Sequence, residues 1–302
     1  MDLAAIRTFC RAVEAGNLTA ASKALHITKS VASRRIQSLE DDLGVKLLSR
    51  TTKGVTPTDE GALFYERSLR VLSDLEDAAQ AVKHTNDNLV GTLRITAPRS
   101  YVDLHLGPAF MTFLKKHPGL KLEMNLTDER VDIIGGGYDM GLRIANELSD
   151  TSLIARKLGD IRHHVIASPA YLAEHGTPKT PADLKDHNCV FYSNVDATKH
   201  WTFGEEGSRK GYRVDGQMAS NSGMMQLAAA VEGLGIAILP DFFLKTVVQD
   251  GSVVTLFDDI PRPNSSLLAL YPEKRLLPLK VRLFIDFLAK WLADERNSCS
   301  VC

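Results

Sequence analysis

Residues 28–43 constrain the fold of this 302-residue chain most, because they form a helix with one apolar face that neighbouring elements must cover. The apolar positions recur at steps of 4, 3 and 4: Ala32, Ile36, Leu39 and Leu43. Thr28 stands where an N-cap is expected, and Gly44 stands where a helix ends. The pattern therefore predicts a helix that packs its apolar face onto other helices.

The preceding residues supply that cover. Residues 3–13 repeat apolar side chains at helical spacing: Leu3, Ile6, Phe9, Cys10 and Val13. Residues 19–25 form a second, Ala-rich helix that permits close packing, and His26 and Ile27 make the turn that follows it. Three short helices with this tight turn predict a helix-turn-helix.

A hairpin and a long helix follow. Residues 45–57 predict two short strands around the basic turn Arg50-Thr51-Thr52-Lys53-Gly54, which has the form of a wing. Residues 58–87 predict a long helix capped by Thr58. Its apolar seam steps by 3 or 4 residues: Tyr65, Leu69, Leu72, Leu75, Ala79 and Val82. Because no neighbouring element in the sequence covers this seam, we interpret the helix as a dimerisation element.

The charge distribution favours a localised nucleic-acid surface. The net charge of the whole chain is −1, whereas residues 18–57 carry seven basic and three acidic side chains, a local excess of 7 − 3 = +4. The polar face of the helix at residues 28–43 carries Lys29, Ser30, Ser33, Arg34 and Gln37. These side chains suit base edges and phosphates in a major groove. The alternative is an ordinary solvated helix face; the Ala-rich helix before it and the basic wing after it favour DNA.

Residues 88–302 alternate strands and helices, which predicts α/β layers with mostly parallel sheets. One of the expected helices is Val131–Ile134. Ligands of open α/β sheets bind beyond the carboxyl ends of the strands. That rule selects three places: Pro98–Tyr101, Thr127-Asp128 and Ser220–Ser222. Helix N-termini at the first and third places favour an anion, and a small carboxylate is the expected ligand class. The alternative is that Ser100 and Ser222 only cap helices.

The first 88 residues resemble the LysR-type transcriptional regulators. The matching stretches include Ile6–Phe9, Gly16–Ser22, Ala24–Thr28, Ser33–Ile36, Leu39-Glu40, Leu43–Val45, Leu47–Arg50 and Thr58–Gly61. The remainder is similar to the effector domain of that family at Gly91–Ile95, Tyr138–Arg143, Ala167–Leu172 and Gly233–Pro240. The resemblance implies an all-α winged helix-turn-helix N-terminal domain joined by a long linker helix to an α/β two-lobed, periplasmic-binding-protein-like domain.

The resemblance also implies a division of the chain and a set of site residues. Residues 1–58 would bind DNA, 59–88 would dimerise and 89–302 would bind the effector, with lobe I at 90–162 and 267–302 and lobe II at 163–266. The DNA contacts would come from Thr28, Lys29, Ser30, Ser33, Arg34, Gln37, Arg50 and Lys53. Lys29 and Ser30 depart from the Gln and the Pro or small residue that the family often has, and Lys29 would favour guanine or a phosphate.

The expected effector contacts are Arg99, Ser100, Tyr101, Thr127, Arg143, Asn221 and Ser222. Arg143 has an alternative as the structural partner of Asp139, four residues earlier. The expected partners are double-stranded promoter DNA, a small anionic effector, further copies of the chain as a homodimer or homotetramer, and RNA polymerase.

No cofactor, metal site or catalytic set is legible, so we expect no enzyme. His163 and His164 would point to opposite faces of a strand, and Cys299 and Cys302 lack a second ligand pair. The absence of a long apolar run and the four scattered cysteines fit the bacterial cytoplasm. Two other hypotheses remain: an enzyme with a hidden site, and a ligand-binding protein whose DNA-reading head is vestigial.

Overall fold

The fold was analysed in a computed structural model, which describes residues 1–51, 54–82, 89–145, 152–194, 200–273 and 277–298. The chain divides into two compact units, Met1–Thr92 and Leu93–Cys302.

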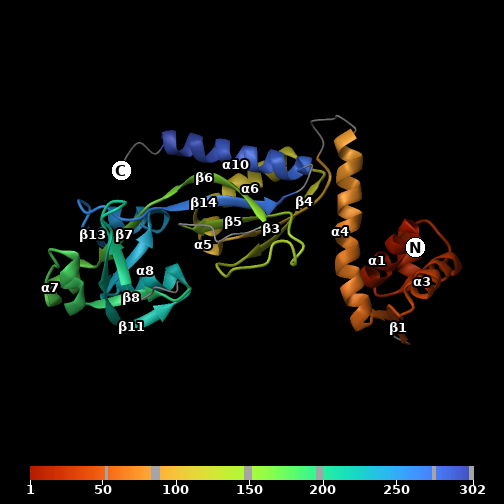
Figure 1. Cartoon of the computed structure of the whole chain (residues 1–302), viewed down its shortest axis with the longest axis horizontal. Helices are drawn as coiled ribbons and strands as arrows, with labels where there is room; N and C mark the ends of the chain where they lie inside the picture. Colours follow the sequence, from red (N-terminus) through yellow and green to blue (C-terminus); the bar gives the residue numbers. More distant parts are fainter. Residues whose placement is uncertain (52–53, 83–88, 146–151, 195–199, 274–276, 299–302) are drawn as a thin grey trace. The chain divides into compact units, whose positions relative to one another are not determined.

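The first unit is a helix-turn-helix with a two-stranded wing and a long helix (Figure 1). Its elements are α1 (Leu3–Ala15), α2 (Leu18–Ala24), α3 (Lys29–Leu43), β1 (Leu48–Thr51), β2 (Gly54–Pro57) and α4 (Asp59–Val82). The strands β1 and β2 are antiparallel, with Leu48 opposite Pro57. The predicted fold class of this part of the chain is confirmed.

The helix ends follow the predicted caps. The Thr28 hydroxyl accepts a hydrogen bond from the Val31 N–H at 3.3 Å and starts α3. Gly44 ends α3 in the left-handed conformation, with φ of 70°. The Thr58 hydroxyl accepts from the Gly61 N–H at 3.0 Å at the start of α4. Each of the two threonine hydroxyls gives a hydrogen-bond partner to a backbone N–H at a helix start. The left-handed glycine ends α3 at the residue that the sequence pattern predicts.

The core of this unit is centred on Phe9, which is fully buried, and on the inner face of α3. Ala32, Ile36 and Leu39 are at most 1% exposed, as predicted. Leu43 is 36% exposed, so its predicted place on the buried face is wrong. It is the last residue of α3, and the chain turns away at Gly44 before other elements can cover it.

Part of the predicted dimer seam of α4 packs against other residues of the same chain. Tyr65, Leu69 and Leu72 pack against the core around Phe9, and the Phe9 and Tyr65 ring centroids are 6.4 Å apart. The expectation that these three residues await a partner helix is therefore wrong. Among the described side chains of α4, the large apolar ones that are exposed are Leu63, Val71 and Leu75, at 56%, 55% and 43%. We call these three residues the α4 stripe; Ala79 and Val82 have no described side chains.

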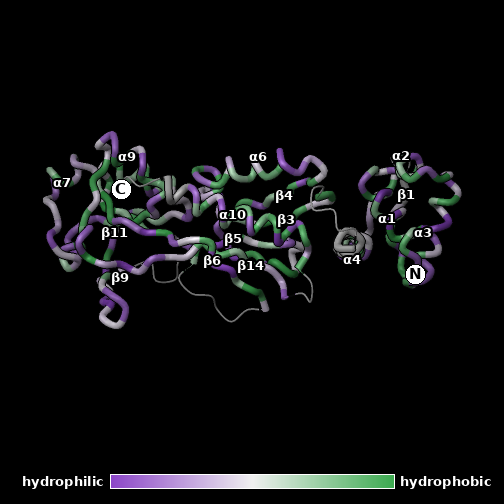
Figure 2. The backbone as a smooth tube through the Cα atoms, turned by 90° about the horizontal axis from the view of Figure 1, so that it is seen from above, coloured by the Kyte–Doolittle hydropathy of each residue, from purple (hydrophilic) through white to green (hydrophobic). Residues whose placement is uncertain are grey.

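The second unit begins with a five-stranded sheet in the order β4-β3-β5-β14-β6. Its strands are β3 (Gly91–Ala97), β4 (Leu120–Leu126), β5 (Met140–Ala145), β6 (Leu153–Ile161) and β14 (Ser265–Pro272). The associated helices are α5 (Arg99–Tyr101), the π-helical turn η1 (Val102–Leu106), α6 (Gly107–Lys116) and α10 (Leu279–Ser298). Helices α6 and α10 contact each other, and the Phe110 and Phe284 rings meet at 5.3 Å (Figure 1). Figure 2 shows the hydrophobic stretches of these strands.

A second five-stranded sheet has the order β11-β8-β12-β7-β13. Its strands are β7 (His163–Ala167), β8 (Asn188–Tyr192), β11 (Asp215–Ser220), β12 (Ile236–Pro240) and β13 (Val254–Leu256). The other elements are α7 (Pro169–His175), η2 (Pro181–Asp186), the hairpin β9 (His200–Phe203) and β10 (Lys210–Arg213), α8 (Gly223–Val231), η3 (Asp241–Phe243) and α9 (Lys245–Gln249). Two sheets with their own helices confirm the predicted two-lobed α/β architecture.

Two expectations for this unit are wrong. The sheets are mixed, because β14 pairs antiparallel with both β5 and β6, and β7 pairs antiparallel with both β12 and β13. Residues 133–137 form hydrogen-bonded turns, and no helix covers Val131–Ile134 in this described stretch. The Asp132 carboxylate accepts from the Gly135 N–H at 2.7 Å, and three consecutive glycines disfavour a helix.

Candidate DNA-binding and effector sites

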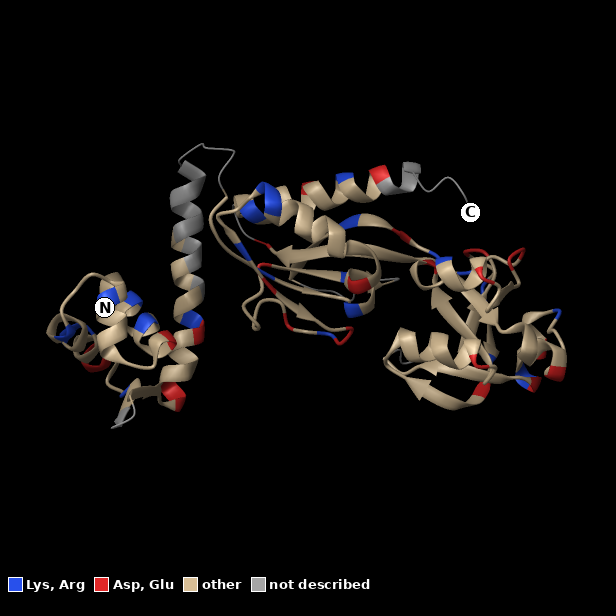
Figure 3. Ribbon diagram, turned by 180° about the vertical axis from the view of Figure 1, so that it is seen from behind, with Lys and Arg blue, Asp and Glu red and all other residues tan. Residues whose placement is uncertain are grey.

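The outer face of α3 is largely exposed. Lys29, Ser30, Arg34 and Gln37 are exposed, and Ser33 is half-buried. This is the surface opposite the buried Ala32, Ile36 and Leu39. Figure 3 shows the basic positions of this unit in blue. Thr28 is exposed. Its hydroxyl accepts from the Val31 N–H as the N-cap of α3 and also lies 2.9 Å from the Ser30 hydroxyl.

The wing is fixed to the turn between α1 and α2. The Val55 N–H donates to the Gly16 carbonyl at 2.8 Å. A Cβ at Gly54 would lie 2.3 Å from that carbonyl oxygen, and Gly54 has φ of 139°, so only glycine fits. Arg50 lies on β1 opposite Val55. Lys53, the other predicted wing contact, lies outside the described residues.

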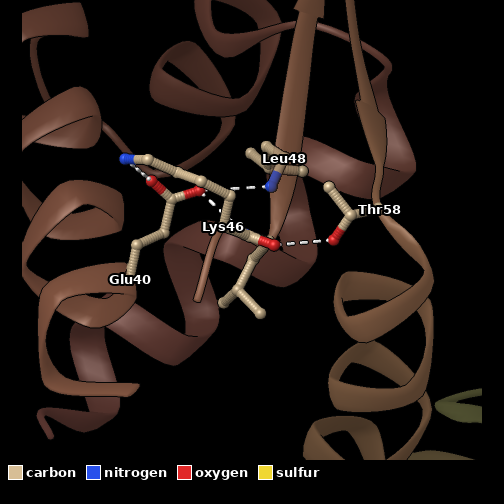
Figure 4. A network of polar contacts seen from close by, with 5 residues as sticks. Glu40, Lys46, Leu48 and Thr58 are labelled. Atoms are coloured by element: carbon tan, nitrogen blue, oxygen red, sulfur yellow. Dashed lines mark hydrogen bonds and ion pairs between the residues drawn. The ribbon is translucent and has the colours of Figure 1, made fainter. Parts of the chain in front are cut away.

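A buried carboxylate connects α3 to the segment that leads into the wing (Figure 4). Glu40 is 6% exposed and accepts hydrogen bonds from the Leu47 N–H at 2.9 Å and the Leu48 N–H at 3.2 Å. The Lys46 ammonium lies 2.7 Å from the same carboxylate, and the Thr58 hydroxyl donates to the Lys46 carbonyl at 2.7 Å. These contacts fix the start of the wing relative to α3.

In the second unit, the ends of β3 and β4 lie side by side. The Thr127 N–H donates to the Ala97 carbonyl at 2.9 Å, and the Thr127 hydroxyl accepts from the Glu129 N–H at 3.2 Å. Arg99 is exposed and its guanidinium donates to the Leu126 carbonyl at 3.3 Å. Ser100 is half-buried on α5, the helix that starts directly after β3. The structure thus brings together three of the predicted effector residues.

Tyr101, another expected effector contact, is a buried packing residue. It is 3% exposed, and its ring centroid lies 5.0 Å from that of His105 and 4.9 Å from that of Phe242. Phe242 belongs to η3, which follows strand β12 of the second sheet. Tyr101 therefore packs between elements attached to the two sheets.

The predicted residues of the second sheet follow β11. The Ser222 hydroxyl caps α8 by accepting from the Met225 N–H at 3.4 Å, and Asn221 is exposed. The Ser193 N–H donates to the Ser220 carbonyl at 3.0 Å, which places the ends of β8 and β11 together. Ser222 therefore caps a helix, as the alternative interpretation predicted. Ser100 does not, because α5 has Pro98 at its N-cap position and no side-chain cap.

Arg143 is half-buried on β5, and its guanidinium donates to the Leu142 carbonyl at 2.7 Å and to the Thr96 hydroxyl at 3.0 Å. Burial lowers its pKa, and the nearby Asp128 carboxylate opposes that shift. The alternative pairing with Asp139 is wrong. Asp139 lies 3.5 Å from the buried ammonium of Lys280 and accepts from the Arg94 N–H at 2.8 Å.

Two further residues belong to this candidate site. Asp128 lies at the predicted place Thr127-Asp128 but was not among the expected effector contacts, and Tyr192 was not predicted. Burial raises the pKa of Asp128, while hydrogen bonds from the Tyr192 hydroxyl and the Arg99 N–H and the charges of Arg143 and Arg99 act in the opposite direction. Burial, and then the charge of Asp128, raise the pKa of Tyr192 to about 12. Tyr192 is the last residue of β8 in the second sheet. The available signal was position, because each follows or ends a strand.

Two hollows lie elsewhere on the second unit. A hollow of about 440 Å³ is lined by Tyr171, His175, Asp186, Asn188, Gln217, Gly233 and Leu234. Another, of about 180 Å³, is lined by Arg94, Glu123, Met124, Asn125 and Tyr138. Neither contains a predicted effector residue. Within the described ranges, no group of three His, Cys, Asp or Glu side chains is placed to hold a metal ion. None of the described helices is both long and apolar enough to cross a membrane.

Comparison with protein families matches both units. Residues 3–62 match the model "Bacterial regulatory helix-turn-helix protein, lysR family", and residues 86–293 match "LysR substrate binding domain". An uncharacterised HTH-type transcriptional regulator of Haemophilus influenzae is 35% identical over 279 residues, which are 92% of this chain and 96% of that protein. The HTH-type transcriptional activator AaeR of Escherichia coli is 31% identical and is matched over 95% of this chain and 92% of its own length.

Solved structures agree over almost the full length. CrgA, a LysR-type transcriptional regulator of Neisseria meningitidis, has a TM-score of 0.61 and 29% identity, with 97% of this chain and 99% of that chain covered. The virulence activator AphB of Vibrio cholerae has a TM-score of 0.58 and 30% identity, with coverage of 96% and 99%. The relatives named here are transcriptional regulators.

Proposed function

Since the chain belongs to the LysR family of transcriptional regulators, we propose that it binds promoter DNA through α3 and its wing under the control of a small carboxylate held between the two sheets. The observation that carries the proposal is the division of α3 into a fully buried apolar face and an exposed basic and polar face. The proposed division of labour is DNA binding by residues 1–58, dimerisation by 59–88 and effector binding by 89–302.

In the DNA complex, the exposed side chains of α3 read base edges, and Arg34 is the principal contact. Ser30, Ser33 and Gln37 flank it on the same face, and Lys29 contacts a guanine or a phosphate. Thr28, Arg50 and Lys53 hold the phosphate backbone. The test is a gel shift and footprint of the full chain on the DNA upstream of its own gene. A protein whose DNA-reading head is vestigial would give no footprint there.

The proposed assembly is a homodimer or homotetramer that works in the bacterial cytoplasm with RNA polymerase. The α4 stripe supports the dimer, because Leu63, Val71 and Leu75 are spaced by eight and four residues and are left uncovered in the chain.

Placing charges on the α4 stripe should dissociate the dimer. The double change Leu63→Glu and Val71→Glu removes apolar burial of about 1.5–3 kcal/mol per side chain and adds like charges across the two-fold axis. We expect the dimer Kd to rise at least about 100-fold, measured by sedimentation equilibrium. Ala62→Glu, an exposed position of α4 outside the stripe, is the control and should leave the Kd unchanged. Equal Kd values for the double variant and the wild type would exclude the stripe as the dimer contact.

The effector prediction centres on Ser100, which is half-buried beside the ends of β3 and β4. A thermal-shift screen of small carboxylates on the full chain identifies the ligand. For that ligand, Ser100→Ala should weaken binding about 10-fold, because a hydrogen bond to a charged group contributes roughly 1.5 kcal/mol or more. Calorimetric titration gives the Kd, and Ser152→Ala, an exposed serine of the same unit, serves as the control. An unchanged Kd in Ser100→Ala would remove this residue from the site.

A further inference from the structure

Arg262 places a positive charge in a part of the second unit that gives it no partner. The Nε and Nη1 atoms of its guanidinium are buried, and neither has a hydrogen-bond partner among the described residues. Burial lowers the pKa of Arg262 to about 10, and no described carboxylate opposes that shift. A charge removed from water is costly unless an opposite charge and hydrogen bonds compensate it, so this guanidinium lacks the groups that a buried cation needs.

The guanidinium lies against an aromatic ring. Its central carbon is 4.6 Å from the centroid of the Phe203 ring, at the end of β9. Phe203 is 2% exposed, and its ring centroid is 5.8 Å from that of Phe257. The face of a ring attracts a cation but has no acceptor oxygen, so Phe203 stabilises part of the charge and leaves the N–H donors of Arg262 unpaired.

Arg262 is also held in place by the chain around it. Residues 257–264 connect β13 to β14 and form a crossover between the two sheets. The Gly204 N–H, directly after β9, donates to the Pro261 carbonyl at 2.7 Å. Phe257 has a left-handed backbone with φ of 62°, which a bulky residue adopts only where its surroundings impose it. These contacts tie the crossover to the β9–β10 hairpin and oppose a swing of Arg262 into solvent.

The other crossover leads to His163 on the same side of the second sheet. Side chains alternate along β7, so His163 shares a face with Val165 and Ala167, which belong to the core cluster that contains Phe203. Burial, and then the charge of Arg262, lower the pKa of His163 to about 4, so its imidazole is neutral at neutral pH. The surroundings of Arg262 are therefore electropositive and favour an anion.

We propose that Arg262 is the binding group of an anion site at the crossover between the two sheets: a small oxyanion, either a carboxylate or a phosphate, accepts hydrogen bonds from the guanidinium and supplies the missing negative charge. The site is additional to the proposed effector site, because Arg262 lies on the segment before β14 and not at the ends of β3, β4 or β11. The residue as a whole is half-buried, so an ion from solution can reach its guanidinium. The bound anion stabilises the contact between the hairpin and the crossover.

The test is a thermal-shift titration of the full chain with sodium acetate and with sodium phosphate, each at up to about 10 mM, against sodium chloride at the same ionic strength. We expect at least one probe to raise the melting temperature of the wild type by about 3 °C more than the reference, which corresponds to a Kd of about 1 mM. Arg262→Met keeps an apolar contact with Phe203 but loses the charge, and it should lose this rise. Without a probe it should melt no lower than the wild type, because it buries no unpaired charge.

Arg213→Met is the matched control, since Arg213 is an exposed arginine on β10 of the same hairpin, and it should respond like the wild type. Ser100→Ala should also keep the response, which separates this site from the proposed effector site. If Arg262→Met does not fold, Arg262→Gln takes its place and should likewise lose the rise.

Three results would overturn the inference: an Arg262 variant that responds like the wild type, a wild type that responds to neither probe, or a response that Ser100→Ala abolishes. An Arg262→Met protein that melts below the wild type by the same amount at every probe concentration would assign Arg262 to packing on Phe203 alone. Gel shifts on the same samples report the proposed function separately, because its failure appears as a wild type that binds no operator.

Discussion

Replacement of Arg34 by alanine should abolish specific operator binding while the N-terminal unit stays folded. Arg34 is exposed on α3, and the residues that build the core lie on the opposite face of the helix. A bidentate contact of arginine with guanine contributes roughly 1–3 kcal/mol of discrimination, and a dimer makes the contact twice. The expected loss is therefore about 2–6 kcal/mol, or roughly 30-fold to 20,000-fold in specific affinity.

The measurement is a footprint and a quantitative gel shift at several salt concentrations, with non-specific DNA as competitor. Non-specific binding should fall far less, because it depends on the total number of phosphate contacts. Arg11→Ala is the control: Arg11 is an exposed arginine of the same unit and pairs with Glu14 at 2.7 Å on α1. Operator binding by Arg34→Ala equal to that of Arg11→Ala would contradict the assignment of α3 as the recognition helix.

Local rules were sufficient for the helix-turn-helix because its signals lie within a few residues of each other. The caps Thr28 and Thr58 and the helix end at Gly44 depend on the side chain or backbone of one residue and its nearest turn. The buried positions Ile36 and Leu39 follow from helical spacing alone. The prediction that Leu43 is buried was wrong, because helical spacing does not indicate where the covering helices end.

The α4 helix shows the limit of a periodicity argument. Steps of three and four residues identify an apolar face, but they do not identify the element that covers it. Tyr65 and Leu72 are covered by the core around Phe9 of the same chain, whereas Leu63 and Val71 are exposed on a different face. Only the tertiary path of the chain distinguishes these two faces.

The second unit shows the same limit over longer distances. The alternation of strands and helices predicted the α/β class but not the direction of β14, which returns from the second sheet and pairs antiparallel with β5. The strand-end rule located Ser100 and Thr127, whose neighbours in the sequence are strands. It did not pair Asp128 with Tyr192, because these residues come from different sheets and are 64 positions apart (192 − 128).

Removal of the Glu40 side chain should have the second large effect, on the stability of the N-terminal unit. In Glu40→Ala, the N–H groups of Leu47 and Leu48 lose their acceptor in a buried setting. Each unsatisfied buried N–H costs about 1–3 kcal/mol, so the expected loss for the two groups is about 2–6 kcal/mol. Lys46 is 70% exposed, and its ion pair with Glu40 contributes less than about 1 kcal/mol. Lys46→Ala should therefore be much milder than Glu40→Ala.

Hydrogen exchange of the intact chain, read by mass spectrometry on peptides that cover residues 44–58, measures this local stability. Asp41→Ala is the control, because Asp41 is an exposed acid on the same helix and should change the opening free energy by less than about 0.5 kcal/mol. Glu40→Gln, which keeps one acceptor oxygen but no charge, should fall between the wild type and Glu40→Ala. Equal protection in Glu40→Ala and Asp41→Ala would show that the carboxylate does not hold the wing.

The same carboxylate predicts a direction for the pH dependence. Burial alone would raise the pKa of Glu40, but Lys46 and the N–H groups of Leu47 and Leu48 outweigh it, so the pKa is lowered in the folded chain. A carboxyl with a lowered folded-state pKa stabilises the fold fully above its unfolded value of about 4.3, and that contribution is lost as the pH falls through the folded-state value. Protection of residues 44–58 should thus decrease on acidification below about pH 4.3 in the wild type. In Glu40→Gln this decrease should be smaller, because the amide does not titrate, and an equal decrease in both proteins would assign the acid sensitivity to other groups.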